Sequence, residues 1–235
     1  MMSVTASRRQ FAVLWDVDGV LIDSAEQHRQ AWHALARARD VAYTDADFWA
    51  TFGMRNSDII PRVFHVAASE QVTALADYKE RIYRELLVAQ AVALPGAREL
   101  MAALHHAGYR QAIGSSAPEE NIRTIVRLLD LAPWLDASVS GETVARGKPA
   151  PDIFLAAAAS LGIEPAHCLV IEDAPAGVAA AHAGGMRCLA VRRAGQADAP
   201  GLDTAELMVD SLLDASVATV DGLLGLASYP AGGTA

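Results

Sequence analysis

The fold of this chain is decided by one short stretch, Phe11-Ala-Val-Leu-Trp-Asp16-Val-Asp18-Gly19-Val20. Five apolar residues at its start indicate a buried strand, and two carboxylates one residue apart follow directly. Because alternate residues of a strand point to opposite sides, Asp16 and Asp18 share one side. Gly19 then allows a sharp turn. We expect this strand to deliver two acids to its carboxyl end, where open parallel sheets bind ligands.

The chain after this strand is helical from residue 25 to residue 92, with no stretch typical of a buried parallel strand. Ser24 suits the N-cap of its first helix. Gly53 interrupts the segment, and the residues after it form either a loop facing the ligand crevice or an ordinary turn between helices. We therefore divide the chain into a core, residues 1–24 and 93–235, and a helical cap, residues 25–92.

From Leu94 onwards, short apolar strands alternate with helices, which is typical of βαβ units and a mostly parallel sheet. We expect strands at residues 109–114, 137–140, 167–171 and 186–191, with a possible short strand at 206–209 and a closing helix at 215–226. The tail, residues 228–235, is expected to fray. The predicted fold class is α/β, with a Rossmann-like, mostly parallel sheet and an inserted all-helical cap.

Polar residues follow several of the expected strands. Ser115 and Ser116 stand between a strand and a helix, where free backbone N–H groups either bind an anion or are simply capped. Lys148 lies in Gly-Lys-Pro-Ala-Pro, whose prolines stiffen the loop. Glu172 and Asp173 form a second acid pair. Such acid pairs repel each other unless a metal ion or a shared proton lies between them.

In this order, the motifs resemble those of the haloacid dehalogenase superfamily of phosphatases and phosphomutases. The matching segments are Asp16-Val-Asp-Gly-Val, Ser115, Gly147-Lys-Pro-Ala-Pro, and Ile171-Glu-Asp followed by Gly177. The stretch Asp18-Gly-Val-Leu-Ile-Asp-Ser-Ala-Glu-Gln-His28 is similar to the branch that holds β-phosphoglucomutase and related sugar-phosphate phosphatases. The resemblance covers residues 11 to about 192.

The resemblance implies roles for the core residues. Asp16 would be the nucleophile that becomes an aspartyl phosphate, and Asp18 the general acid and base. A Mg²⁺ ion would be held by the side chains of Asp16 and Asp173 and the backbone carbonyl of Asp18, with Glu172 beside them, either directly or through water. The transferring oxygens would be held by Ser115, Ser116 and Lys148. An acid near neutral pH needs a raised pKa, and we expect the adjacent carboxylates to raise the pKa of Asp18.

The resemblance also implies that the cap contacts the substrate. His28 would lie near the hinge and the acid-base residue, or else on the surface. Arg55, Asn56 and Lys79 occupy cap positions that face the substrate in relatives. The cap arginine of β-phosphoglucomutase falls opposite Asn56, one residue after Arg55, and this offset favours a phosphatase over a mutase.

Composition and charge narrow the function further. The chain has 235 residues and a formal net charge of −9, with no run of Lys or Arg longer than two, so we expect no nucleic-acid or membrane surface. No stretch suits a secretory signal or a membrane span. Cys168 and Cys188 lack metal or redox spacing and are expected to be buried, reduced thiols. We therefore expect a cytoplasmic monomer.

Taken together, the residues and the resemblance predict a Mg²⁺-dependent phosphatase that hydrolyses a small phosphorylated metabolite, a sugar phosphate, through an aspartyl phosphate. The second acid, Asp18, favours phosphoryl transfer, because a dehalogenase has no leaving oxygen to protonate. A phosphomutase of the β-phosphoglucomutase type is the alternative enzyme. A non-catalytic binding protein with the same fold is the alternative of another class, and the cost of four unneutralised acids argues against it.

Overall fold

The computed structural model describes residues 8–192 and 200–226, so the tail that was expected to fray lies outside the described residues. Within these ranges a six-stranded parallel sheet has the order β3-β2-β1-β4-β5-β6. The strands are β1 (Ala12–Trp15), β2 (Arg110–Ser115), β3 (Ala137–Ser140), β4 (Cys168–Glu172), β5 (Arg187–Val191) and β6 (Leu207–Val209). The predicted α/β class with a parallel sheet is confirmed.

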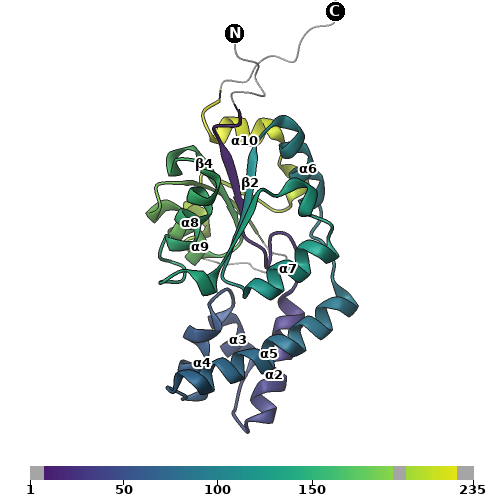
Figure 1. Cartoon of the computed structure of the whole chain (residues 1–235), viewed down its shortest axis with the longest axis vertical. Coiled ribbons are helices and arrows are strands. Elements are labelled where there is room, and N and C mark those ends of the chain that lie inside the picture. Colours follow the sequence, from purple (N-terminus) through teal and green to yellow (C-terminus); the bar gives the residue numbers. More distant parts are fainter. Residues whose placement is uncertain (1–7, 193–199, 227–235) are drawn as a thin grey trace, which may run out of the picture.

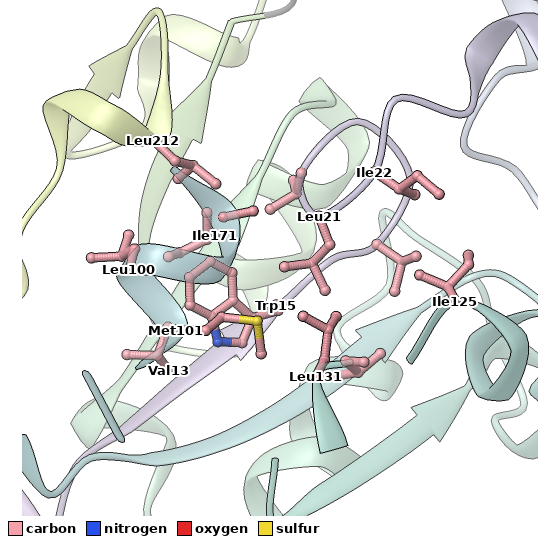
Figure 2. Packing of buried hydrophobic residues seen from close by; sticks show 14 of the residues in the cluster. Val13, Trp15, Leu21, Ile22, Leu100, Met101, Ile125, Leu131, Ile171 and Leu212 are labelled. Atoms are coloured by element: carbon pink, nitrogen blue, oxygen red, sulfur yellow. The ribbon is translucent and has the colours of Figure 1, made fainter. Parts of the chain in front are cut away.

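Strand β1 lies at the centre of the sheet, with Trp15 opposite Ile113 of β2 and Ile171 of β4. Helices cover both faces: α6 (Ala97–Ala107), α7 (Glu119–Leu128) and α10 (Val217–Leu223) on one, α8 (Asp152–Leu161) and α9 (Pro175–Ala183) on the other. Val13 and Trp15 pack into the first layer, shown in Figure 2, and Ala12 and Leu14 face the second. This alternation explains why all of β1 is apolar.

Four further helices lie together at the end of the sheet where the strands finish (Figure 1). They are α2 (Ala25–Ala38), α3 (Asp45–Thr51), α4 (Asn56–Phe64) and α5 (Ser69–Gln90). Their apolar faces form a hydrophobic cluster of their own, which includes Trp32, Leu35, Phe48 and Ile60. The spacing of Trp32 and Leu35 on α2 places both on one helix face.

The chain enters and leaves these helices through two connections that lie side by side. After Asp18, Gly19 adopts a φ of +84°, and its N–H donates to the carbonyl of Ile22 at 2.9 Å. The returning segment pairs with this turn, because the Leu94 N–H donates to the Leu21 carbonyl at 3.1 Å. The turn that follows the acid pair is therefore also the point where the helices α2 to α5 join the sheet.

The sequence led to predictions about membrane-spanning helices and about the two cysteines. None of the helices in residues 8–192 and 200–226 is both long and apolar enough to cross a bilayer. Cys168 and Cys188 are buried free thiols, as predicted, and burial raises the pKa of Cys168 to about 12.

Candidate active site

Three neighbouring strands bring predicted site residues to one edge of the sheet. Asp16 follows β1, Ser115 ends β2 and Glu172 ends β4. Because β2, β1 and β4 are adjacent and parallel, their carboxyl ends meet at that edge. The N–H of Asp16 donates to the carbonyl of Ile171 at 3.0 Å, which extends the pairing of β1 and β4 to Asp16 itself. The sheet thus holds the Asp16 backbone firmly beside Glu172.

Lys148 lies between two of these carboxylates. Its ammonium nitrogen is 2.6 Å from Asp16 Oδ1 and 2.6 Å from Glu172 Oε1. The Lys148 side chain is only 5% exposed, and its nitrogen lies 4.8 Å from the centre of the Phe154 ring. Burial acts to lower the pKa of Lys148, but the two carboxylates outweigh it, so the net direction is upward. Lys148 is therefore a cation at the edge of the sheet.

Glu172 is held by the backbone on its other side. Its Oε2 accepts hydrogen bonds from the N–H groups of Asp173 and Ala174, both at 2.8 Å. Gly177 in α9 leaves room for it, since a Cβ atom at that position would lie 1.8 Å from Glu172 Oε1. The glycine of the fourth motif is therefore required by the close approach of this carboxylate.

The acids at this edge fit a divalent cation. Asp16, Glu172 and Asp173 are buried, and each offers one carboxylate oxygen within 4.8 Å of the others. Burial raises the pKa of Asp16 to about 7, although Lys148 acts to lower it. Three carboxylates against one ammonium leave a net charge that a divalent ion would balance. Carboxylate oxygens are the donors that Mg²⁺ prefers, so the donor set fits this ion.

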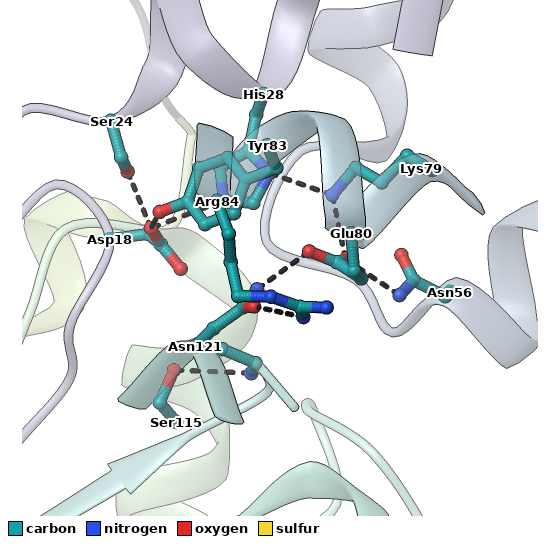
Figure 3. A network of polar contacts seen from close by, with 11 residues as sticks. Asp18, Ser24, His28, Asn56, Lys79, Glu80, Tyr83, Arg84, Ser115 and Asn121 are labelled. Atoms are coloured by element: carbon teal, nitrogen blue, oxygen red, sulfur yellow. Dashed lines mark hydrogen bonds and ion pairs between the residues drawn. The ribbon is translucent and has the colours of Figure 1, made fainter. Parts of the chain in front are cut away.

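Asp18 points away from this cluster and toward the helices. Ser24 Oγ donates to Asp18 Oδ1, and the same oxygen lies 3.2 Å from His28 Nε2 and 3.2 Å from the Tyr83 hydroxyl (Figure 3). The rings of His28 and Tyr83 stack with centroids 3.8 Å apart. Burial acts to raise the pKa of Asp18, but His28 and Ser24 outweigh it and the net shift is downward. The prediction that neighbouring groups raise the pKa of Asp18 is therefore wrong for this arrangement.

A pocket lies between the sheet edge and the helices. On the core side it is lined by Asp16, Asp18, Ser115 and Ser116. Ser115 is almost fully buried, and its Oγ accepts the N–H of Ala117 at 3.2 Å. The turn between β2 and α7 therefore presents backbone and hydroxyl groups to the same space as the Asp16 carboxylate.

The helices supply three of the predicted cap residues to this pocket. His28 comes from α2, Asn56 from the start of α4 and Lys79 from α5. The ammonium of Lys79 lies 2.8 Å from His28 Nδ1, while the other ring nitrogen of His28 faces Asp18. These contacts form a chain of polar groups from the helices to the acid pair of β1. Whether they contact substrate remains a prediction.

Arg55 takes a different direction. Its Nε lies 3.0 Å from Asp58 Oδ2, and its Nη1 donates to the carbonyl of Val144 at 3.3 Å. The guanidinium packs against Gly147, where a Cβ atom would lie 2.7 Å from Arg55 Nε. Arg55 therefore contacts the loop that carries Lys148 and is not among the pocket-lining residues in the described part of the chain.

Sequence reasoning missed three residues of the site: Glu80, Tyr83 and Asn121. Glu80 lines the pocket, Tyr83 contacts Asp18, and Asn121 of α7 donates to Glu80 at 2.6 Å. One signal was available, because Tyr83 lies four residues after Lys79 and therefore on the same face of the helix. The contact between Glu80 and Asn121 joins residues of different helices, so no local pattern could reveal it.

The sequence and the fold were compared with known proteins. Residues 12–185 match the model of the haloacid dehalogenase-like hydrolases. The chain is 33% identical over 189 residues to β-phosphoglucomutase of Bacillus subtilis (strain 168), over 77% of this chain and 82% of that protein. It is 33% identical over 201 residues to hexitol phosphatase A of Escherichia coli (strain K12), over 85% of this chain and 90% of that protein.

The chain is also similar to part of a longer plant protein and to a solved structure. The protein SUPPRESSOR OF QUENCHING 1, chloroplastic, of Arabidopsis thaliana is 37% identical over 187 residues, or 77% of this chain, which spans only 18% of that protein. The structure of β-phosphoglucomutase from Clostridium difficile matches with a TM-score of 0.81 at 23% identity, over 91% of this chain and 96% of that one. This likeness shows a shared fold.

Proposed function

The chain belongs to the haloacid dehalogenase-like hydrolases, and we propose that it is a Mg²⁺-dependent phosphatase of a sugar phosphate. One observation carries the proposal: the Asp16 carboxylate lies 2.6 Å from the Lys148 ammonium, beside the acids Glu172 and Asp173. A phosphate dianion and a carboxylate repel each other, so such a nucleophile needs cations beside it. Hexitol phosphatase A among the relatives supports a phosphorylated polyol or sugar as the substrate class.

The proposed reaction has two steps. An Asp16 oxygen forms a bond to phosphorus, the bond from phosphorus to the sugar oxygen breaks, and Asp18 gives its proton to that oxygen. Water then attacks the aspartyl phosphate, Asp18 takes a proton from the water, and inorganic phosphate leaves Asp16. The acid role requires Asp18 to exchange its contacts with His28 and Tyr83 for one with the leaving oxygen. We propose that the helices in residues 25–92 act as a cap that permits this exchange.

The other core residues bind and orient the phosphoryl group. Lys148 would pair with its oxygens, and Ser115 with the N–H groups around Ser116 would donate hydrogen bonds to them. Asp16, Glu172 and Asp173, with the backbone carbonyl of Asp18, would hold Mg²⁺. When bound, this ion would neutralise charge on the phosphoryl oxygens.

The function is tested by phosphate release from an aryl phosphate and from a panel of sugar and polyol phosphates, with Mg²⁺ and with a chelator. We expect release that needs Mg²⁺. A folded chain that releases no phosphate from any of these substrates would contradict the proposal and favour a binding protein.

Replacing Asp173 is expected to weaken Mg²⁺ binding. Asp173→Ala removes one of three clustered carboxylates, so the dissociation constant for Mg²⁺ should rise by at least about tenfold. Calorimetric titration of the metal in the absence of substrate measures this change. Asp210→Ala, which removes an exposed carboxylate, is the control and should leave the titration unchanged. Equal Mg²⁺ affinities in the wild-type chain, Asp173→Ala and Asp210→Ala would show that Asp173 does not bind the metal.

Water is the expected acceptor of the phosphoryl group. β-Glucose 1-phosphate with a trace of the 1,6-bisphosphate should yield inorganic phosphate or no reaction, because the Arg55 guanidinium is turned to Asp58 and the core loop. Phosphorus NMR follows all the species in one sample. Rapid formation of glucose 6-phosphate without phosphate release would establish the mutase, which the relationship to β-phosphoglucomutase makes the second candidate.

A further inference from the structure

Glu80 of α5 is a buried carboxylate in the wall of the pocket that faces the sheet. Its Oε1 accepts hydrogen bonds from Asn56 at 2.7 Å and from Lys79 at 2.8 Å. Its Oε2 accepts from Asn121 at 2.6 Å (Figure 3). Burial acts to raise the pKa of Glu80, but Lys79, His28 and Asn121 outweigh it and the net shift is downward, so the carboxylate is an anion. Three partners on three helices hold it in place.

The charge of Lys79 is balanced inside the protein. Among the described residues that line the pocket, Lys79 is the only lysine or arginine. The side chains of Lys79 and Glu80 are 2% and 5% exposed, so water hardly screens the pair. The Lys79 nitrogen also lies 2.8 Å from His28 Nδ1 and 5.0 Å from the centre of the Trp32 ring. Lysine and glutamate cancel, and this wall therefore presents no excess positive charge from them.

The other cap cation that was expected to face the substrate is engaged outside the pocket. Arg55, which directly precedes α4, binds Asp58 of that helix and the carbonyl of Val144 in the core. A ligand that needed Arg55 would have to break both contacts. A second anionic group on a substrate would therefore find no cation whose charge is unmatched among the described cap residues that line the pocket.

We propose that Glu80 makes this site selective for monophosphates with an uncharged, hydroxyl-bearing leaving group, and against sugar bisphosphates. The inference rests on the proposed phosphatase function and specifies its substrate class. The phosphoryl group that reacts would lie at Asp16 and Lys148, so the far end of the substrate would reach the wall that holds Glu80. A second phosphate there would give up its hydration without meeting a cation whose charge is unmatched, which costs binding energy, whereas uncharged hydroxyls both donate to a carboxylate and accept from Asn56 or Lys79.

The test compares phosphate release from β-glucose 1-phosphate and β-glucose 1,6-bisphosphate in the wild-type chain, Glu80→Gln and Glu85→Gln. We expect wild-type kcat/KM to be at least about tenfold lower for the bisphosphate. Glu80→Gln keeps the shape but removes the charge, so it should shrink this difference by about tenfold. Glu85→Gln removes a carboxylate that is 64% exposed on the same helix and should leave the difference unchanged. Thermal unfolding checks that each variant is folded.

Two results would overturn the inference. If the wild-type chain has the same kcat/KM for the bisphosphate and the monophosphate, the selectivity is absent. This comparison needs no variant. If folded Glu80→Gln keeps the wild-type ratio, Glu80 does not set it.

Failure of the phosphatase function itself would show differently, as no phosphate release from any sugar, polyol or aryl phosphate of the panel. In that case, or if the chain is an active phosphatase that releases phosphate from neither glucose phosphate, binding replaces turnover as the measurement. Calorimetric binding of the same two sugar phosphates in Mg²⁺ then measures the discrimination directly. Tighter or equal binding of the bisphosphate would again overturn the proposal, and weaker binding that Glu80→Gln relieves would support it.

Discussion

Asp16→Asn is expected to abolish turnover, with a loss of about 10⁵-fold or more, because an amide cannot form the acyl phosphate. The change is nearly isosteric, and Glu172 remains 2.6 Å from Lys148, so the buried ammonium keeps one counter-ion. The fold should therefore persist. Phosphate release from a good aryl substrate, measured at saturating Mg²⁺, gives the size of the loss.

A control with the same chemical change separates this effect from damage to the protein. Asp77→Asn alters an exposed aspartate on α5 and should retain wild-type kcat and KM. Thermal unfolding and circular dichroism of both variants establish that they are folded. Mg²⁺-dependent turnover of Asp16→Asn within tenfold of wild type, in a preparation free of other phosphatases, would exclude Asp16 as the nucleophile.

Asp18→Asn is expected to lower kcat by about 10² to 10⁴-fold, the usual size of general acid-base catalysis. The loss should depend on the leaving group, since a phenol of low pKa needs less protonation than a sugar hydroxyl. A series of aryl phosphates with leaving groups of rising pKa, compared with a sugar phosphate, measures this dependence. An equal loss of kcat for all leaving groups would show that Asp18 is not the general acid.

Tyr83→Phe controls for the position of Asp18 rather than for its chemistry. The variant keeps the ring that stacks on His28 but removes the hydroxyl that lies 3.2 Å from Asp18 Oδ1. We expect a loss smaller than that of Asp18→Asn and the same for all leaving groups. A leaving-group dependence in Tyr83→Phe as steep as that of Asp18→Asn would mean that the hydroxyl itself takes part in proton transfer.

Much of the core arrangement could be predicted because each motif is local. A strand pattern followed by acids defines both the strand and the edge at which the acids stand, as for Asp16 after β1 and Glu172 at the end of β4. Parallel pairing then brings these ends together without any further information. Gly177 could be marked from its motif, although its reason, the space needed by Glu172, is visible only in three dimensions.

The side chains of the helices in residues 25–92 were harder to predict, because contacts between helices set their directions. Arg55 and Lys79 were both expected to face the substrate, yet Lys79 lines the pocket while Arg55 binds Asp58 and the core loop. In a loop, a small change of backbone conformation can turn a side chain through a large angle. Sequence periodicity therefore cannot predict the direction of the Arg55 side chain. Asp18 shows the same effect, since its contacts with His28 and Ser24 reverse the expected direction of its pKa.

The sequence alone determined the α/β class, the family and the order of the core motifs, because apolar alternation and short polar motifs act over a few residues. Only the tertiary structure decided that Glu80 neutralises Lys79 within the pocket wall and that Asn121, 41 residues away, holds Glu80 there. The reason is physical: burial in a low dielectric makes a charge depend on every neighbour within a few ångströms, and those neighbours come from helices that meet only when the chain has folded.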